Sequence, residues 1–436
     1  MTQVAPYRDV RASFAQERRF VVDEQRGPGR DRLVRLAFRV RGPLSTDALG
    51  GALAHVVARH DALRASFHRV GETVVQRVHA SVPAPLEVAG PDAAGRTAVR
   101  RWLEELAGRA LDRSLPPPLR LSVAGVGSER HLLALVVDHL VLDGWSLKVL
   151  LGELSEAYAA LLAGRAPALP PVAVQLPEWS EDQRRRLAGE RLARLVGRWR
   201  RRLGDDPGII ALPLAGVREH DGPPAFRGER LRALVPADRL AGLRALAAAE
   251  RATPYVAVLA CLARVLRDAS GRDRLVLTTS FANRAGAGLG RTIGRLSHPL
   301  VLALDLAGAG DLRAVLRAVR LSVFDTLGDA ELPFELLRRD LWPGTYRATT
   351  TDPTVYFDVA APPWDDLRLA GAVVEPEEWE DDACIPGLEF LAHDTGGELD
   401  VRLGYEVTTY TGEYARGIVA RFMEEVDHAA AIAGGR

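Results

Sequence analysis

The pattern of apolar and polar residues predicts a chain in which strands and helices alternate. Leu33–Val40 and Thr73–His79 alternate as strands with one exposed face do, whereas Leu132–Val137 is a short apolar run typical of a buried strand. Apolar residues at steps of three and four predict helices elsewhere. The main predicted helices span residues 13–25, 46–58, 97–111, 147–164, 181–203, 237–250, 252–271, 312–327 and 411–430.

A proline-rich stretch divides this pattern into two parts. Residues 164–178 lack any periodicity, as linkers do. A chain of 436 residues is longer than one hydrophobic core usually organises. We therefore expect an α/β (α+β) fold with two subdomains, residues 1–178 and residues 179–436.

Composition narrows the class of protein. The formal net charge is zero, which disfavours nucleic acid as a partner. No apolar run reaches the length that spans a bilayer, and the N-terminal sequence has no apolar signal core. We therefore expect a cytoplasmic protein without a membrane partner. The two cysteines are too few for a zinc cluster or a disulfide framework, and we expect no metal site.

The chemistry is expected where the apolar run Leu132–Val137 ends. Asp138 and His139 follow it directly, Asp143 and Gly144 come shortly after, and a helical pattern begins there. Polar side chains in such apolar surroundings need partners, because their desolvation costs free energy. Two interpretations are open. Either His139 is a hydrogen-bonded core histidine and Asp143 caps the next helix, or His139 faces a pocket as a base or donor while Asp143 holds the loop.

This stretch resembles the HHxxxDG active-site motif of the condensation domains of nonribosomal peptide synthetases. His139, Asp143 and Gly144 match the motif, and Asp138 stands in place of its first histidine. Further segments resemble other motifs of the family, in the family's order. These are residues 13–20 (SxAQxR and an aromatic residue), 59–67 (RHDALRASF), 282–284 (ANR), 293–306 and 333–335 (PFE).

For the fold, the resemblance implies two halves like chloramphenicol acetyltransferase, arranged within one chain as a V-shaped pseudo-dimer. Latch and floor-loop segments would belong to the second half. Because the two halves already form a pseudo-dimer, we expect a monomer. The motif histidine would lie in a tunnel between the halves. Peptidyl or acyl carrier proteins, as donor and in some reactions as acceptor, would present substrates on phosphopantetheine, and the chain itself would bind no cofactor.

For the activity, the resemblance implies an acyltransferase of natural-product biosynthesis. An amine or alcohol would attack a carrier-bound acyl or aminoacyl thioester, with His139 as base or hydrogen-bonding residue. The residues implied at the catalytic site are Asp138, His139, Asp143 and Gly144. Those implied to support the site are Arg64, Trp145 and Arg284, the last through an ion pair with Asp143. Those implied to line the channel are Ser13, Ser297 and His298.

Asp138 is the departure from the family pattern. A carboxylate there would either orient the loop or favour the charged form of His139, which is a poorer base. We expect His139→Ala to abolish transfer and Asp138→Ala only to weaken it. Two other functions stay open: a docking module that recruits tailoring enzymes without catalysis, and an acyltransferase that esterifies a small alcohol. Since the pattern contains no adenylation, thioesterase or carrier segment, a condensation enzyme of this sequence is expected to be free-standing and to act in trans.

Overall fold

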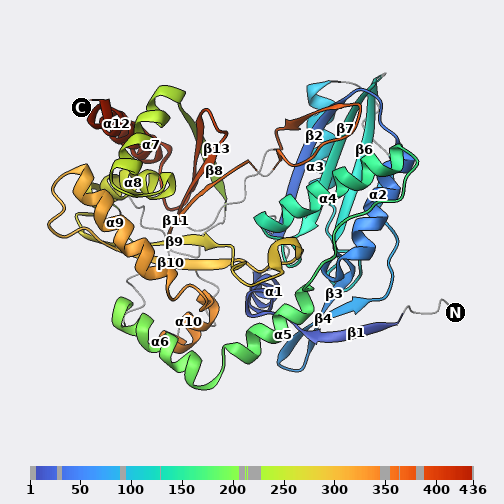
Figure 1. Cartoon of the computed structure of the whole chain (residues 1–436), viewed down its shortest axis with the longest axis horizontal. Coiled ribbons are helices and arrows are strands. Elements are labelled where there is room, and N and C mark those ends of the chain that lie inside the picture. Colours follow the sequence, from blue (N-terminus) through green and yellow to red (C-terminus); the bar gives the residue numbers. More distant parts are fainter. Residues whose placement is uncertain are drawn as a thin grey trace. The chain divides into compact units, whose positions relative to one another are not determined.

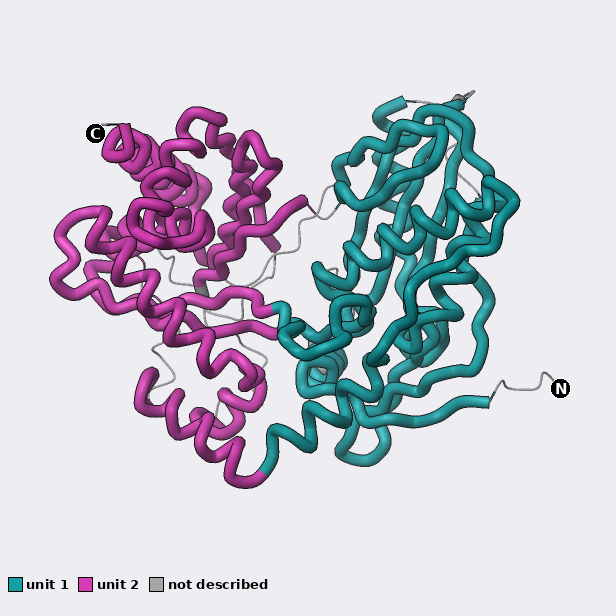
Figure 2. Tube along the Cα trace, in the orientation of Figure 1, with its two compact units in different colours: residues 1–188, 282–297, 363–381 teal, residues 189–281, 298–362, 382–436 magenta. Residues whose placement is uncertain are grey.

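The structure is a computed structural model of the chain, and it describes residues 6–26, 32–88, 95–127, 129–205, 212, 214, 227–343, 354–362, 364–379 and 387–434. Helices mix with strands in both halves of the chain, which confirms the predicted α/β class (Figure 1). The chain forms two compact units, coloured separately in Figure 2. Unit 1 comprises residues 1–188, 282–297 and 363–381, and unit 2 comprises residues 189–281, 298–362 and 382–436.

Unit 1 contains a five-stranded sheet in the order β12-β2-β7-β6-β5 and a three-stranded sheet in the order β1-β4-β3. Its strands are β1 (Tyr7–Arg11), β2 (Leu33–Arg41), β3 (Ala65–Val70), β4 (Thr73–His79), β5 (Leu86–Val88), β6 (Leu119–Gly127), β7 (Arg130–Asp138) and β12 (Val373–Glu377). Its helices are α1 (Phe14–Arg26), α2 (Thr46–Arg59), α3 (Arg96–Gly108), α4 (Gly144–Leu162) and α5 (Leu176–Arg186), with short 3₁₀ turns η2 (Asp61–Arg64) and η4 (Leu289–Arg291).

Strand β7 is the centre of the larger sheet, with β2 and β6 antiparallel on its two sides. Leu133, Leu135 and Val137 lie in the core that the sheet forms with α2 and α4. Leu132 and Ala134 point to the opposite face, because successive side chains of a strand alternate, and there they join the core formed with α3. Helices on both faces explain why this strand is a continuous apolar run in the sequence.

Unit 2 is built on a six-stranded sheet in the order β10-β9-β11-β13-β14-β8. Side chains from this sheet share one core with α7, α8, α9 and α12. Its strands are β8 (Gly228–Val235), β9 (Arg274–Phe281), β10 (His298–Asp305), β11 (Thr354–Ala360), β13 (Gly387–Asp394) and β14 (Leu399–Glu406). Its helices are α6 (Gly189–Leu203), α7 (Ala237–Ala249), α8 (Pro254–Ser270), α9 (Leu312–Leu327), α10 (Phe334–Leu341) and α12 (Gly412–Gly434).

The predicted single helix over residues 181–203 is wrong, because two helices occupy this region. Helix α5 ends at Arg186, and α6 begins at Gly189, whose φ of +55° breaks the helical path. Helix α5 packs against β1 and η2 of unit 1, so the change from unit 1 to unit 2 follows Ala188. The periodic pattern spans both helices and does not mark this break.

Two later segments of the chain belong to unit 1. Residues 282–297 connect β9 to β10, and residues 363–381 include β12, which pairs antiparallel with β2. These segments lie far from the first 188 residues in sequence, so only tertiary contacts reveal that they belong to unit 1.

Within the described residues, no single helix is both long and apolar enough to cross a membrane. The consecutive helices α7 and α8 pass that test when taken together, but they are bent by 102°.

Candidate active site

The motif loop, residues 138–144, starts where β7 ends and leads into α4. Hydrogen bonds from other segments hold its backbone. The N–H of His139 donates to the carbonyl oxygen of Arg32, just before β2, at 2.9 Å. The side chain of Gln16, in α1, donates to the carbonyl oxygen of Leu140 at 2.9 Å. Residues 140–142 are fully buried, whereas the His139 side chain is half-buried. The loop is therefore fixed while the imidazole keeps some access to solvent.

The hydrogen bonds of His139 determine which ring nitrogen carries the proton. Nδ1 lies 2.6 Å from the carbonyl oxygen of Leu142. A carbonyl oxygen only accepts, so Nδ1 must carry the hydrogen and donate it. In the neutral ring the lone pair is then on Nε2, which has no hydrogen-bond partner in the described residues. This nitrogen is free to accept a proton or a hydrogen bond.

The surroundings of His139 favour its neutral form. Its pKa is lowered from the ordinary value of 6.5 to about 3, chiefly because burial disfavours the charged ring. The guanidinium groups of Arg295 and Arg19 lower the pKa further. These effects outweigh the hydrogen bond to Leu142 and the charge of Asp143, which raise it. The imidazole is therefore neutral near pH 7.

Asp143 joins the motif loop to residues 282–297. Its Oδ1 accepts from the N–H of Ser146, which caps α4, and from Nη2 of Arg284 at 2.9 Å. Its Oδ2 accepts from the N–H groups of Leu296 and Ser297, both at 3.0 Å. The predicted ion pair with Arg284 is thus confirmed, and so is the helix cap. Four donors on one buried carboxylate hold the loop in a single geometry.

Ser146 and Trp145 extend the same connection. The Ser146 hydroxyl donates to the carbonyl oxygen of Gly294 at 2.7 Å and lies 2.8 Å from Nη2 of Arg284. The indole N–H of Trp145 donates to the carbonyl oxygen of Gly290 at 2.9 Å. The first turn of α4 and residues 284–297 are therefore joined by one hydrogen-bond network that includes Asp143 of the motif loop.

Asp138 is buried and paired, not directed at the motif histidine. Its carboxylate accepts two hydrogen bonds from Arg113, at 2.7 and 3.0 Å, and lies 3.7 Å from Arg32. It also accepts from the N–H of Leu140 at 2.9 Å. Arg113 in turn pairs with Asp23 of α1 at 2.6 Å. Of the two interpretations of this residue, the contacts favour a carboxylate that orients the loop.

We expect Asp138→Ala to destabilise the protein by about 3 kcal/mol, because it removes the carboxylate from a buried ion pair. Arg113 keeps Asp23 as a partner, so the protein is expected to fold and to retain part of its activity. Urea unfolding measures the loss. Asp9→Ala is the matched control, since the Asp9–Arg77 pair is partly exposed and is expected to contribute less than about 1 kcal/mol. Equal effects of the two substitutions would contradict the role given to Asp138.

Two of the predicted site residues lie away from the motif loop. Ser13, predicted to line the channel, is fully buried, and its hydroxyl caps α1 by accepting from the N–H of Gln16 at 3.2 Å. Arg64, predicted to support the site, pairs with Asp61 at 2.6 Å and donates to the carbonyl oxygen of Ala80 at 3.0 Å. Among the described residues, neither side chain forms a hydrogen bond or ion pair with the motif loop.

The remaining predicted residues occupy three different environments. Gly144 is exposed at the start of α4, and a Cβ there would meet no atom within 4 Å. Ser297 is half-buried and reaches the site through its backbone N–H on Asp143. His298 begins β10 in unit 2 and is buried.

Three residues of this region were not assigned a site role from sequence. Gln16 belongs to the SxAQxR segment and Ser146 directly follows the motif, so their positions are visible in the sequence but their contacts are not. Arg113 lies in an irregular segment with no pattern around it. Its pairing with Asp138 arises only when the chain folds.

Comparison with known families finds one family model that matches nearly the whole chain. The family model described as Condensation domain matches residues 8–432. Phosphinothricin tripeptide synthetase PhsC of Streptomyces viridochromogenes is 34% identical over 330 residues, which is 74% of this chain and 30% of that protein. The chain spans at most 30% of the length of the first curated relatives it matches.

Solved structures share the fold. The X-domain from teicoplanin biosynthesis has a TM-score of 0.84 at 24% identity and covers 98% of this chain and 96% of its own. The same domain has also been solved in a complex with OxyB. The condensation domain of the Monacolin K polyketide synthase MokA has a TM-score of 0.84 at 17% identity, with 97% and 98% coverage.

Proposed function

This chain belongs to the condensation-domain family of nonribosomal peptide synthetases, and from that premise we propose that it is an active acyltransferase. The proposed reaction joins an amine or alcohol to an acyl or aminoacyl group held as a carrier-protein thioester. His139 is the residue that handles the proton. Phosphopantetheine arms of carrier proteins bring the acyl donor, and the chain itself uses no cofactor.

The observation that carries this proposal is the protonation and hydrogen bonding of the His139 imidazole. His139 donates from Nδ1 to Leu142 and leaves Nε2 free, on a ring whose low pKa keeps it neutral. A neutral imidazole with an available lone pair can take a proton from an attacking nucleophile or accept its hydrogen bond.

The proposed chemistry needs no covalent enzyme intermediate. The nucleophile attacks the thioester carbonyl carbon, forming the new C–N or C–O bond, and Nε2 of His139 accepts the proton that the nucleophile loses. The tetrahedral intermediate then expels the carrier thiolate by breaking the C–S bond. The same proton returns from His139 to the sulfur. Asp138 and Asp143 are already engaged by Arg113 and Arg284, so their proposed role is to hold the loop.

A non-catalytic docking module is the second candidate. It is supported by the likeness to the X-domain, which has been solved in a complex with OxyB, and by Asp138 in place of the first motif histidine. A partner enzyme would then bind to the surface without any need for Nε2 of His139.

Acyl transfer tests the two candidates directly. Carrier proteins loaded with acyl or aminoacyl groups are incubated with amine and alcohol acceptors, and products are followed by mass spectrometry. A product made by the wild type but not by His139→Ala supports the acyltransferase and identifies an amide or ester. If no acceptor gives product while an oxygenase binds stably, the docking module replaces it.

The pH dependence of transfer gives an independent prediction. The neutral form of His139 prevails above its pKa of about 3, so kcat/KM is expected to change little between pH 7 and pH 5. A histidine with a pKa of 6.5 would lose about 25-fold in its neutral form over that range. The acceptor should be an alcohol, whose own protonation does not change there.

Stability provides the control for this pH effect. The unfolded chain binds a proton at His139 below about pH 6.5, whereas the folded protein does so only near pH 3, so stability falls as pH decreases through that window. His139→Asn is expected to reduce this acid sensitivity. A rate that falls with an apparent pKa near 6.5 in the wild type would contradict the assignment of His139 as a base that stays neutral in this pH range.

A further inference from the structure

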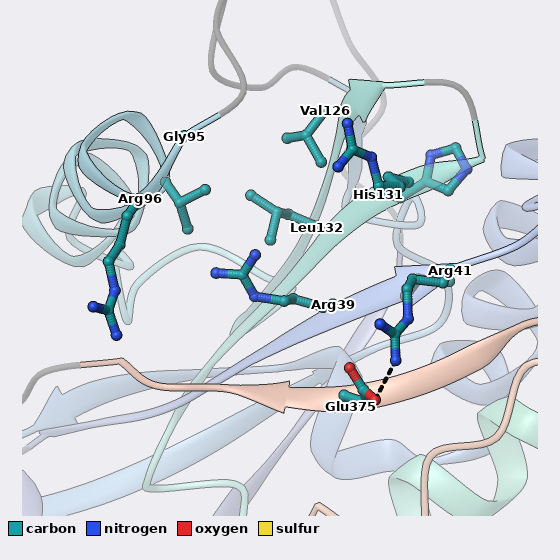
Figure 3. Close-up of a pocket in the computed structure, with 11 residues that line it drawn as sticks. Arg39, Arg41, Gly95, Arg96, Val126, His131, Leu132 and Glu375 are labelled. Atoms are coloured by element: carbon teal, nitrogen blue, oxygen red, sulfur yellow. Dashed lines mark hydrogen bonds and ion pairs between the residues drawn. The ribbon is translucent and has the colours of Figure 1, made fainter.

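A cavity lies in unit 1, on the face of the sheet that α3 covers. Its volume is 460 Å³, within the range of small-molecule sites. It lies between the first turn of α3 and strands β2 and β7, with β12 at its edge (Figure 3). The residues that line it are Arg39, Val40, Arg41, Gly95, Arg96, Val99, Val126, Arg130, His131, Leu132 and Glu375. None of them belongs to the motif loop.

Positive charge dominates this cavity. Arg39 pairs with Glu377 and Arg41 with Glu375, and these pairs join β2 to β12. Counting the described residues that line the cavity together with Glu377, which pairs with Arg39, four guanidinium groups face two carboxylates and leave an excess of two positive charges.

The excess charge belongs to two exposed arginines. Among the residues that the structure describes, the side chains of Arg96 and Arg130 have no ion-pair or hydrogen-bond partner. Figure 3 shows Arg96 descending from the start of α3, while Arg39 reaches across from β2 toward that helix. Arginines from separate elements therefore surround one space, and two of them pair with no carboxylate of the described residues.

The N-terminus of α3 adds to the positive electrostatic potential in the cavity. Its N-cap is Gly95, which offers no side-chain acceptor, and its first turn contains no acidic residue. The first N–H groups of a helix lack intrahelical partners and carry a partial positive charge. Since Gly95 and Arg96 both line the cavity, this charge lies beside the guanidinium groups.

The other lining residues of the cavity are mostly apolar, and a neighbouring cavity adjoins it along α3. Val99, Val126 and Leu132 line it between the charged groups. An adjoining cavity of 340 Å³ shares Arg96 and Val99 and extends along α3 to Trp379. The carboxylates lining this second space are Glu104, Glu377 and Glu378. A ligand would thus have its negative charge at one end only.

We propose that this cavity binds a small phosphate monoester whose organic part is apolar and uncharged. The phosphate would lie between Arg96 and Arg130, because a doubly charged group matches the excess of two positive charges. The organic part would cover Val99 and Leu132 and point toward Trp379. This site is separate from His139 and does not depend on the proposed acyl transfer.

Phenyl phosphate is the probe, and isothermal titration calorimetry on the full chain is the measurement. Arg96→Ala and Arg130→Ala are each expected to weaken binding about tenfold, since each removes charged hydrogen bonds to the phosphate. Arg101→Ala is the matched control, because Arg101 is exposed on the same helix but does not line the cavity. It should change affinity less than about twofold.

Two further ligands separate the contribution of the phosphate from that of the apolar organic part. Inorganic phosphate should bind at least about tenfold more weakly than phenyl phosphate, because it leaves the apolar wall uncovered. Phenol, which lacks the phosphate, should not bind measurably. Thermal melting confirms that each variant is folded. The proposal is overturned if phenyl phosphate does not bind, if phenol binds equally well, or if Arg101→Ala weakens binding as much as Arg96→Ala.

Discussion

His139→Ala is expected to lower kcat for acyl transfer by about a hundredfold to ten-thousandfold, the usual contribution of a positioned general base. The imidazole is neutral, its Nδ1 is used by Leu142, and its Nε2 has no partner in the described structure. Removing the ring removes the acceptor for the proton of the nucleophile. Product formation with a carrier-bound donor measures this loss.

His139→Asn separates the two nitrogens of the ring. The asparagine amide can take the place of Nδ1 and donate to the carbonyl oxygen of Leu142, but it offers nothing at the position of Nε2. We expect this variant to unfold at nearly the wild-type urea concentration and to be as inactive as His139→Ala. Loss of activity would then be traced to Nε2 and not to the shape of the loop.

His55→Ala is the control substitution, since His55 is a partly exposed histidine of α2 outside the motif loop. It should leave transfer unchanged. Full activity of both His139 variants would exclude His139 as the base and remove the main support for the proposed mechanism.

Asp143→Ala is expected to cost about 3–5 kcal/mol of unfolding free energy and to reduce transfer strongly. The Arg284 side chain is 4% exposed and would be left with a buried charge and no carboxylate. The N–H groups of Leu296 and Ser297 would also lose their acceptor, and a buried donor without a partner is costly. Urea unfolding and hydrogen exchange of residues 284–297 measure these effects.

A double-mutant cycle shows whether the pair is the cause. Arg284→Met removes the charge and keeps a long apolar side chain, so the double variant should be more stable than the two single losses predict. We expect a coupling energy of about 1–3 kcal/mol. The exposed pair Arg109–Glu87 serves as a control and should couple by less than about 1 kcal/mol. Additive losses at Asp143 and Arg284 would mean that the carboxylate and guanidinium act independently.

Local chemistry made much of the candidate site predictable. The short apolar run before Asp138 predicted a buried strand, and the periodic residues after Asp143 predicted a helix; the structure has both. An aspartate just before a helix is a common cap. The partner of Asp143 was implied by the resemblance of the ANR segment after β9 to the family's motif. Both contacts are present in the structure.

Contacts between distant segments were not predictable in the same way. Arg113 binds Asp138, and Gln16 binds the carbonyl oxygen of Leu140, although neither pair is close in sequence. Arg64 carries the same kind of side chain as Arg284, yet its nearest carboxylate is Asp61. A side chain that several partners could satisfy is assigned only by the folded geometry.

The sequence by itself determined the alternation of elements, which follows from periodicity, and the family and the position of the motif, which follow from the resemblance of its motifs to those of condensation domains. The tertiary structure decided which nitrogen of His139 is free, what neutralises Asp138, and that residues 282–297 and 363–381 belong to unit 1. The physical reason is that burial, charge pairing and hydrogen-bond direction depend on segments far apart in the chain. The arginine-lined cavity beside α3 is also decided only by the tertiary structure, because β2, α3, β7 and β12 form it together.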